Sequence, residues 1–172
     1  DGGATYAQVA KLTADDAAAG DVFGFRVVIN GGTVVVGAHD KSDRGAVYVF
    51  LTTDGGATYG QVAKLTADDA ASGDQLGRSV AIDGDTIVAG ANYAGTGGAA
   101  YLFLTTDGGA TYGQVAKLTA SDGASDDRFG ESVAIDGQKV VVAAYRDDDG
   151  GSDSGSAYVF ALPSTDYAQL AK

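Results

Sequence analysis

Residues 73–91 read GDQLGRSVAIDGDTIVAGA, and this stretch decides the fold because the chain contains it three times. Versions of it occupy residues 20–38 (GDVFGFRVVINGGTVVVGA) and residues 126–144 (DDRFGESVAIDGQKVVVAA). In each version a short polar step, such as Asp83-Gly84 or Asn30-Gly31, separates two apolar runs. A step of this kind predicts a β-hairpin with a type I′ turn, which needs positive φ at both central positions.

The three versions belong to a longer internal repeat. The string DGGATY begins at positions 1, 54 and 107, which gives a period of 53 residues. A fixed period of about this length is typical of repeat architectures. Tyr48 and Tyr101 keep the same spacing, but Tyr158 follows Tyr101 by 57 residues. We therefore predict a four-residue insertion in the third repeat, within the acidic loop 146–155.

Each period contains four strand-like runs bounded by Gly, Asp or Asn. In the second repeat these runs are Ser79–Ile82, Thr86–Ala89, Ala99–Leu104 and Thr111–Leu118. The central runs, such as Val34–Val36, are apolar on both alternating faces, so both faces should be covered. The fourth run carries polar residues and a lysine, which suits an outer strand. The pattern predicts an all-β chain of β-propeller-type repeats with three four-stranded antiparallel blades.

We predict a single repeat domain over residues 1–172. Its parts are an extra outer strand (1–12), blade 1 (13–65), blade 2 (66–118) and blade 3 (119–172). The extra strand is Thr5–Leu12, and a related segment, Asp166–Lys172, ends the given sequence. The sequence has no Met, even at position 1, so we expect a processed product or part of a longer protein.

Three blades are too few for an ordinary closed propeller, which has about four to eight. Open end blades would expose an apolar sheet face, which soluble proteins avoid. We therefore expect completion by other copies of the chain or by more of a parent protein. Two copies could close a six-bladed ring, or copies could add head to tail into a filament. In either case Thr5–Leu12 is expected to join a neighbouring sheet by strand addition.

Three pairs of dipeptides in register carry a family resemblance. They are Phe23-Gly24 with Gly37-Ala38, Leu76-Gly77 with Gly90-Ala91, and Phe129-Gly130 with Ala143-Ala144. With these pairs the chain resembles the FG-GAP repeats of integrin α-like β-propellers. The sequence of its repeats is similar to a microbial and algal branch of that family. The resemblance implies, in general terms, extracellular adhesion and ligand binding. The third copy has Ala143 in place of glycine, and the family's calcium loop has no counterpart in the tight turn Asp83–Asp85.

Composition excludes several partner classes. The 172 residues carry a formal net charge of −12, which disfavours nucleic acid and anionic lipid as partners. No apolar run approaches the length of a membrane-spanning helix. Because the sequence has no cysteine, disulfide bonds cannot indicate the cellular compartment of the protein. With the family resemblance, we expect a secreted or cell-surface protein.

One acidic loop is a candidate metal site. Asp147, Asp149 and Asp153 are alternate carboxylates of the run DDDGGSD (147–153), whose glycines suit a sharp turn, and they could supply oxygen ligands to Ca²⁺. No glutamate closes the loop, so it is not an EF-hand. The alternative is a solvated acidic loop on an already acidic protein.

Other polar residues have structural explanations that compete with functional ones. The acidic loop Asp15–Asp21 recurs in all three repeats, which favours capping of backbone N–H groups by aspartate over ion binding. Tyr6, Tyr59 and Tyr112 could form a sugar-binding strip, but packing on the blade rim is the favoured interpretation. The single histidine, His39, is expected on the surface and not as a general base.

These observations predict a non-catalytic extracellular module with a structural or adhesive role, whose partners are other copies of itself. A propeller that recognises a protein or glycan ligand, with or without calcium, is the alternative. A hydrolase that uses loop carboxylates is the weakest alternative, because carboxylates are too abundant here to single out a pair.

Overall fold

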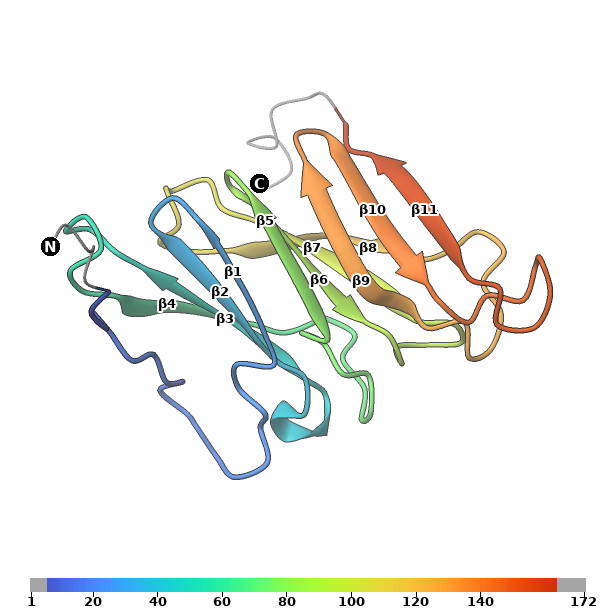
Figure 1. Ribbon diagram of the computed structural model, residues 1–172, viewed down its shortest axis with the longest axis horizontal. Coiled ribbons are helices and arrows are strands. Elements are labelled where there is room, and N and C mark those ends of the chain that lie inside the picture. Colours follow the sequence, from blue (N-terminus) through green and yellow to red (C-terminus); the bar gives the residue numbers. More distant parts are fainter. Residues whose placement is uncertain (1–5, 164–172) are drawn as a thin grey trace, which may run out of the picture.

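The computed structural model describes residues 6–163, which form three antiparallel β-sheets side by side (Figure 1). We call them blades 1, 2 and 3 in chain order. Blade 1 contains β1 (Arg26–Asn30), β2 (Thr33–Ala38), β3 (Ala46–Leu51) and β4 (Gly60–Leu65). Blade 2 contains β5 (Ser79–Asp83), β6 (Thr86–Ala91), β7 (Ala99–Leu104) and β8 (Gly113–Leu118). Blade 3 contains β9 (Phe129–Asp136), β10 (Lys139–Ala144) and β11 (Ser156–Ala161).

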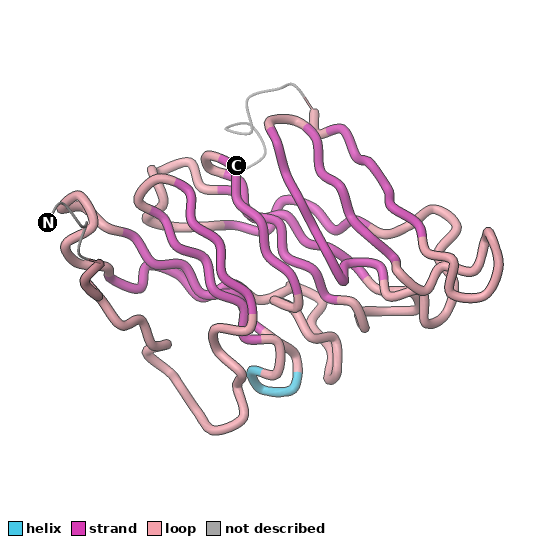
Figure 2. Tube along the Cα trace, viewed as in Figure 1, coloured by secondary structure: helices cyan, strands magenta, loops and turns pink. Residues whose placement is uncertain are grey.

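The all-β prediction is confirmed. Figure 2 shows strands and loops, with η1 (Lys41–Asp43) as the only helical element in the described range. Strands neighbour one another in chain order within each blade, and every pair is antiparallel. Within residues 6–163, no helix has the length and apolar character needed to cross a membrane.

Blades 1 and 2 have the four strands predicted for them. The structure describes three strands in blade 3, and the segment that would supply its fourth, Asp166–Lys172, lies outside the described residues. Residues 6–12, the described part of the extra strand predicted at Thr5–Leu12, have no regular secondary structure in the single chain, so pairing with a neighbouring copy stays a prediction. A strand exists only through hydrogen bonds to a neighbour, and no sheet edge within residues 6–163 pairs with this segment.

The hairpin turns differ by one residue from the prediction. Asp83 pairs with Thr86, so the two central turn residues are Gly84 and Asp85. Of these two, only Gly84 has a positive φ, +52°. A glycine in that first position is typical of a type II′ turn, so the type I′ prediction is wrong.

The hydrophobic core lies between blades. One cluster joins Val35, Val47 and Val49 of blade 1 to Ile87 and Tyr101 of blade 2. A second cluster joins blades 2 and 3 in the same way. The third contains one sheet only, blade 1, covered by residues of the preceding segment such as Leu12 and Ala14. Central strands are therefore covered on both faces, as predicted, wherever a blade has a neighbour.

The predicted insertion is also confirmed. Seven residues (92–98) connect β6 to β7, whereas eleven (145–155) connect β10 to β11. The outer strand β4 alternates exposed and more covered positions, and β8 is exposed at Gly113 and Lys117 and half-buried elsewhere, as expected for strands at the rim.

Candidate functional site: two open blade faces

Successive blades meet where the Phe-Gly step of one, which is Leu76-Gly77 in blade 2, approaches the Gly-Ala step of the blade before it. At the junction of blades 1 and 2, the backbone N–H of Leu76 donates to the Arg44 carbonyl at 3.0 Å. Gly77 has φ +90°, which suits glycine, and a Cβ there would lie 2.6 Å from the Ala46 carbonyl oxygen. A Cβ at Gly37 would lie well under 3.0 Å from the Gly77 carbonyl oxygen. The two dipeptides therefore let two backbones approach more closely than any side chain allows.

The junction of blades 2 and 3 repeats this geometry. The N–H of Phe129 donates to the Gly97 carbonyl at 2.8 Å, and Gly130 has φ +95°. A Cβ at Gly90 would lie well under 3.0 Å from the Gly130 carbonyl oxygen. The hydroxyl of Ser79 donates to that same carbonyl at 2.8 Å. Each blade thus has a leading face, turned to the preceding blade, and a trailing face, turned to the following one.

The leading face of blade 1 is open along β1. Val80 and Ile82 of β5 pack into the core between blades 1 and 2, and Ile82 is 8% exposed. The residues at the same register of β1 are Val27 and Ile29, and they are 66% and 61% exposed. Apolar side chains that a preceding blade would cover therefore face solvent. We call this surface the leading open face.

The aromatic residue beside this face is already positioned as in an internal junction. The Phe23 ring packs edge-on against Tyr48 with ring centroids 5.5 Å apart. Phe129 packs against Tyr158 at the same separation, 5.5 Å. Phe129 is buried by blade 2, whereas Phe23 stays partly exposed. Blade 1 thus has the arrangement of an internal blade without the neighbour.

The trailing face of blade 3 is open as well. Val35 of β2 and Val49 of β3 are fully buried against blade 2. Their counterparts in blade 3, Val141 and Val159, are 37% and 68% exposed. Ala157, beside them on β11, is also exposed. These residues form the trailing open face.

The linker aspartates cap backbone groups, as predicted. The carboxylates of Asp21, Asp74 and Asp127 accept the N–H of the residue three positions earlier, at 2.7, 2.7 and 2.6 Å. All three aspartates are buried. Each one therefore holds the loop that leads into a Phe-Gly step.

A second linker aspartate ties the loops before blades 1 and 2 to the third and fourth strands of the blade that follows. Asp69 accepts the Tyr101 hydroxyl at 2.9 Å and pairs with Lys117 at 2.6 Å. The Lys117 ammonium lowers the pKa of Asp69, and burial together with the Asp69 bond raises the pKa of Tyr101 to about 12. Asp16 binds Tyr48 and Lys64 in the same way, and these bonds lower its pKa to about 2. Sequence analysis missed this pairing, although the Asp, Tyr and Lys recur at the repeat period.

The repeated DGGAT loop is also held by a side chain. Asp107 accepts bonds from the backbone N–H of Thr111 at 2.9 Å and from its hydroxyl at 2.6 Å. The Thr105 hydroxyl donates to Asp107 at 2.8 Å, and together these bonds lower the pKa of Asp107 to about 2. Asp54 makes the same contacts in blade 1. The carboxylate organises the turn between the third and fourth strands.

The candidate calcium ligands are not gathered into one group. Asp147 is buried, and its carboxylate accepts the Tyr158 hydroxyl at 2.7 Å, which lowers its pKa. The nearby carboxylate of Asp147 raises the pKa of Asp149. Asp153 is exposed and lies 4.0 Å from Arg146. Among residues 6–163, no three His, Cys, Asp or Glu side chains are arranged to hold a metal ion. Calcium binding stays a prediction.

The surface position expected for His39 is wrong. Its ring is buried against Phe25, with centroids 4.2 Å apart, and burial lowers its pKa. The Arg78 guanidinium lies over the same Phe25 ring at 4.9 Å and binds Glu131 at 2.9 Å. Residue 39 directly follows the Gly-Ala step, and its ring packs on Phe25 of the same repeat. The spacing of residues along the sequence does not reveal that contact.

The three recurring tyrosines lie in different surroundings. Tyr59 and Tyr112 pack against the hydrophobic clusters of the blades, which confirms rim packing as their role. Tyr6 is almost fully exposed.

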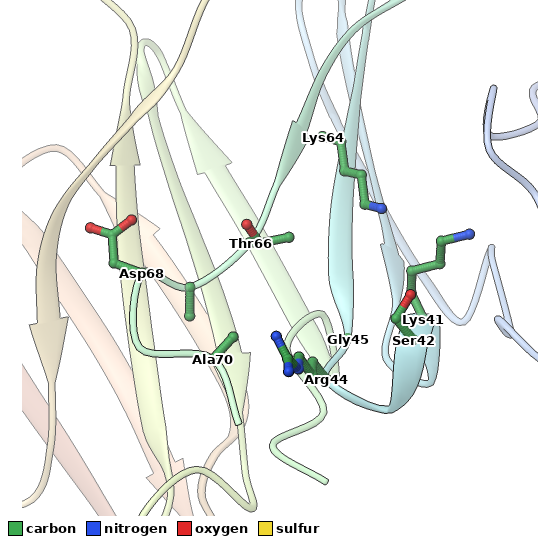
Figure 3. Close-up of a pocket in the computed structure, with 9 residues that line it drawn as sticks. Lys41, Ser42, Arg44, Gly45, Lys64, Thr66, Asp68 and Ala70 are labelled. Carbon is green, nitrogen blue, oxygen red and sulfur yellow. The ribbon is translucent and has the colours of Figure 1, made fainter. Parts of the chain in front are cut away.

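Two hollows lie at equivalent places beside the blade junctions. The first has a volume of about 240 Å³ and lies between the loop 41–45 and the linker 64–70 (Figure 3). The second, about 230 Å³, has Gly97 at the place of Arg44 and Lys117 at the place of Lys64. Lys41, Arg44, Lys64 and Asp68 line the first hollow, whereas Lys117 is the charged residue that lines the second. The two hollows therefore offer no common ligand chemistry and follow from the stacking of the blades.

Comparison with curated protein sequences gives no significant match. The model of the FG-GAP repeat family matches the chain three times, over residues 6–50, 59–103 and 112–160. Each match ends in the third strand of a blade, and the second and third matches begin at the outer strand of the preceding blade, β4 and β8. The dipeptides that give these repeats their name make the close backbone contacts between blades. The chain therefore belongs to the FG-GAP repeat family.

Proposed function

We propose that this protein is a non-catalytic structural or adhesive module that joins other copies of itself through its two open faces. One observation supports this most strongly: positions that are buried between blades inside the chain are exposed at both of its ends. Val159 and its buried counterpart Val49 are the clearest pair, at 68% and 0% exposure. Exposed apolar surface of this kind, in a repeat protein, is where a further repeat packs.

The internal junctions indicate which surfaces fit together. Inside the chain a trailing face always meets a leading face. The trailing open face of one copy should therefore meet the leading open face of another, with Val141 and Val159 facing Val27 and Ile29. Such a contact is head to tail. It closes into a ring if the rotation permits and otherwise extends as a filament.

The roles of the polar residues support a non-catalytic module. The carboxylates of Asp21, Asp69, Asp107 and Asp147 each accept hydrogen bonds that hold a loop. His39 is packed against an aromatic ring and binds its neighbour's carboxylate at 3.5 Å. These groups serve the fold, which leaves them poorly placed to transfer protons to a substrate.

We place the module outside the cell, at a surface or in a matrix. Its net charge of −12 suits a partner that is neutral, basic or identical to itself and disfavours nucleic acid and anionic lipid. FG-GAP repeats of the integrin type, which this chain resembles, act in adhesion.

Light scattering of the 172-residue chain over a wide concentration range tests the proposal. We expect the mass to rise from 17.1 kDa to about twice that value, or to keep growing. Val159→Asp places a charge on the trailing open face and should keep the protein monomeric with an unchanged circular dichroism spectrum. A wild-type mass of 17.1 kDa at every concentration would contradict self-assembly. Repeating the series with calcium and with chelator tests the calcium prediction separately.

A further inference from the structure

One position breaks the rule that governs the contacts between blades. Gly37 in β2 pairs with Val47, Gly90 in β6 pairs with Ala100, and Ala143 in β10 pairs with Ala157. The register thus places Ala143 where blades 1 and 2 have glycine. The close approach of the following blade depends on that glycine.

The added methyl group of Ala143 points toward the trailing open face. At Gly37 and at Gly90, a Cβ would lie well under 3.0 Å from the carbonyl oxygen of the next blade's Phe-Gly step. Real Cβ atoms essentially never come so close to an oxygen. A blade that followed blade 3 in the internal manner would place its own glycine carbonyl on the Ala143 methyl group. The two backbones must therefore separate at this point.

Other parts of the junction are present among the described residues. Gly155 corresponds to Gly98, which contacts Phe129, and both have positive φ, +75° and +102°. On the opposite end of the chain, Gly24 has φ +92° and open space around the position of a Cβ, so it is free to approach a preceding blade. Among these described parts, the methyl group of Ala143 is the obstruction to a close backbone approach.

We infer that Ala143 weakens the junction between copies, so that copies associate reversibly where blades within a chain associate permanently. This inference rests on the proposed self-assembly. The methyl group holds Gly24 of the second copy away from β10, while the apolar contacts of Val141 and Val159 remain available. Overpacking by one methyl group in a close contact is destabilising in protein interiors. Ala143 therefore determines the strength of the contact and leaves the choice of partner unchanged.

Sedimentation velocity of Ala143→Gly tests the inference. We expect the variant to associate at least tenfold more tightly than the wild type, because the glycine removes the obstruction. Ala157→Gly is the matched control: it removes a methyl group from the neighbouring strand of the same face, at the residue that pairs with Ala143. This control should associate no more tightly than the wild type. Equal tightening in both variants would overturn the inference.

A mixing experiment identifies the surfaces independently. Val27→Asp blocks the leading open face, and Val159→Asp blocks the trailing one. Each variant alone should be monomeric, and an equimolar mixture should form a dimer of about twice 17.1 kDa, because one intact pair of faces remains. Dimers of either variant alone would contradict the head-to-tail contact.

The outcomes separate the two proposals. If the wild type associates and Ala143→Gly is no tighter, the inference fails and self-assembly stands. If neither protein associates and the mixture stays monomeric, self-assembly fails and the inference fails with it. If only Ala143→Gly associates, the obstruction is confirmed and self-assembly of the wild type is overturned.

Discussion

Single glycines set the distance between blades. Gly90 lies where the carbonyl oxygen of Gly130 approaches β6, so Gly90→Ala forces two backbones apart. We expect this change to lower the free energy of unfolding by about 3 kcal/mol, at the upper end of overpacking effects. The matched control is Gly60→Ala in β4, where a Cβ would meet nothing within 4 Å and φ is not positive. Urea denaturation should show the control within about 0.5 kcal/mol of the wild type. Similar losses in both variants would contradict this account.

Aspartates of the loops make the fold sensitive to acid. The pKa of Asp107 is lowered to about 2 by its bonds to threonine, whereas an unfolded chain titrates near its ordinary value. The unfolded state therefore binds more protons below about pH 4, and the stabilisation is lost as the pH falls toward 2. We expect the melting temperature of Asp107→Asn to fall less steeply over this range than that of the wild type. Asp136→Asn, an exposed control on β9, should follow the wild type. Parallel curves for all three proteins would contradict the prediction.

At the scale of the element, the linker between blades is fixed by hydrogen bonds to two strands of the next blade. Tyr101→Phe in β7 removes the hydroxyl that binds Asp69 and keeps the buried ring. We expect a loss of about 1 kcal/mol in urea denaturation, as for one hydrogen bond. Tyr93→Phe is the control, because Tyr93 is exposed and its ring stacks on Arg128 without needing the hydroxyl. A loss in the control equal to that of Tyr101→Phe would argue against the role of Asp69.

The elements also show what the sequence could reveal and what it could not. Strands β6 and β7 were predictable because valine, isoleucine and aromatic residues recur at a fixed period between turn residues. The Gly-Ala step was recognisable from its repetition, although the reason for its glycine appears only when the next blade is in place. His39 was misplaced because its ring packs on Phe25, a tertiary contact that the sequence pattern does not show. The segment 6–12 has the composition of an outer strand, but a strand also needs a neighbour.

At the scale of the whole molecule, assembly must overcome like charge. Each copy carries −12, so copies repel one another at low ionic strength. Raising the salt concentration from about 10 mM to about 1 M shortens the Debye length from about 30 Å to about 3 Å. We expect self-association to strengthen over this range, as measured by light scattering. The Val159→Asp variant should remain monomeric throughout. Association of the wild type that weakens with salt would indicate a contact held by ion pairs and would contradict apolar faces.

The number of blades in one copy limits the closed assemblies that copies alone can make. Every copy adds three sheets, so the total in any closed ring must be divisible by three. Of the sizes common among propellers, about four to eight, only six satisfies this condition. Such a ring would alternate two closely packed junctions with one that Ala143 keeps apart. Its two weak joints would lie on opposite sides, so the ring would come apart into halves before any half lost its shape.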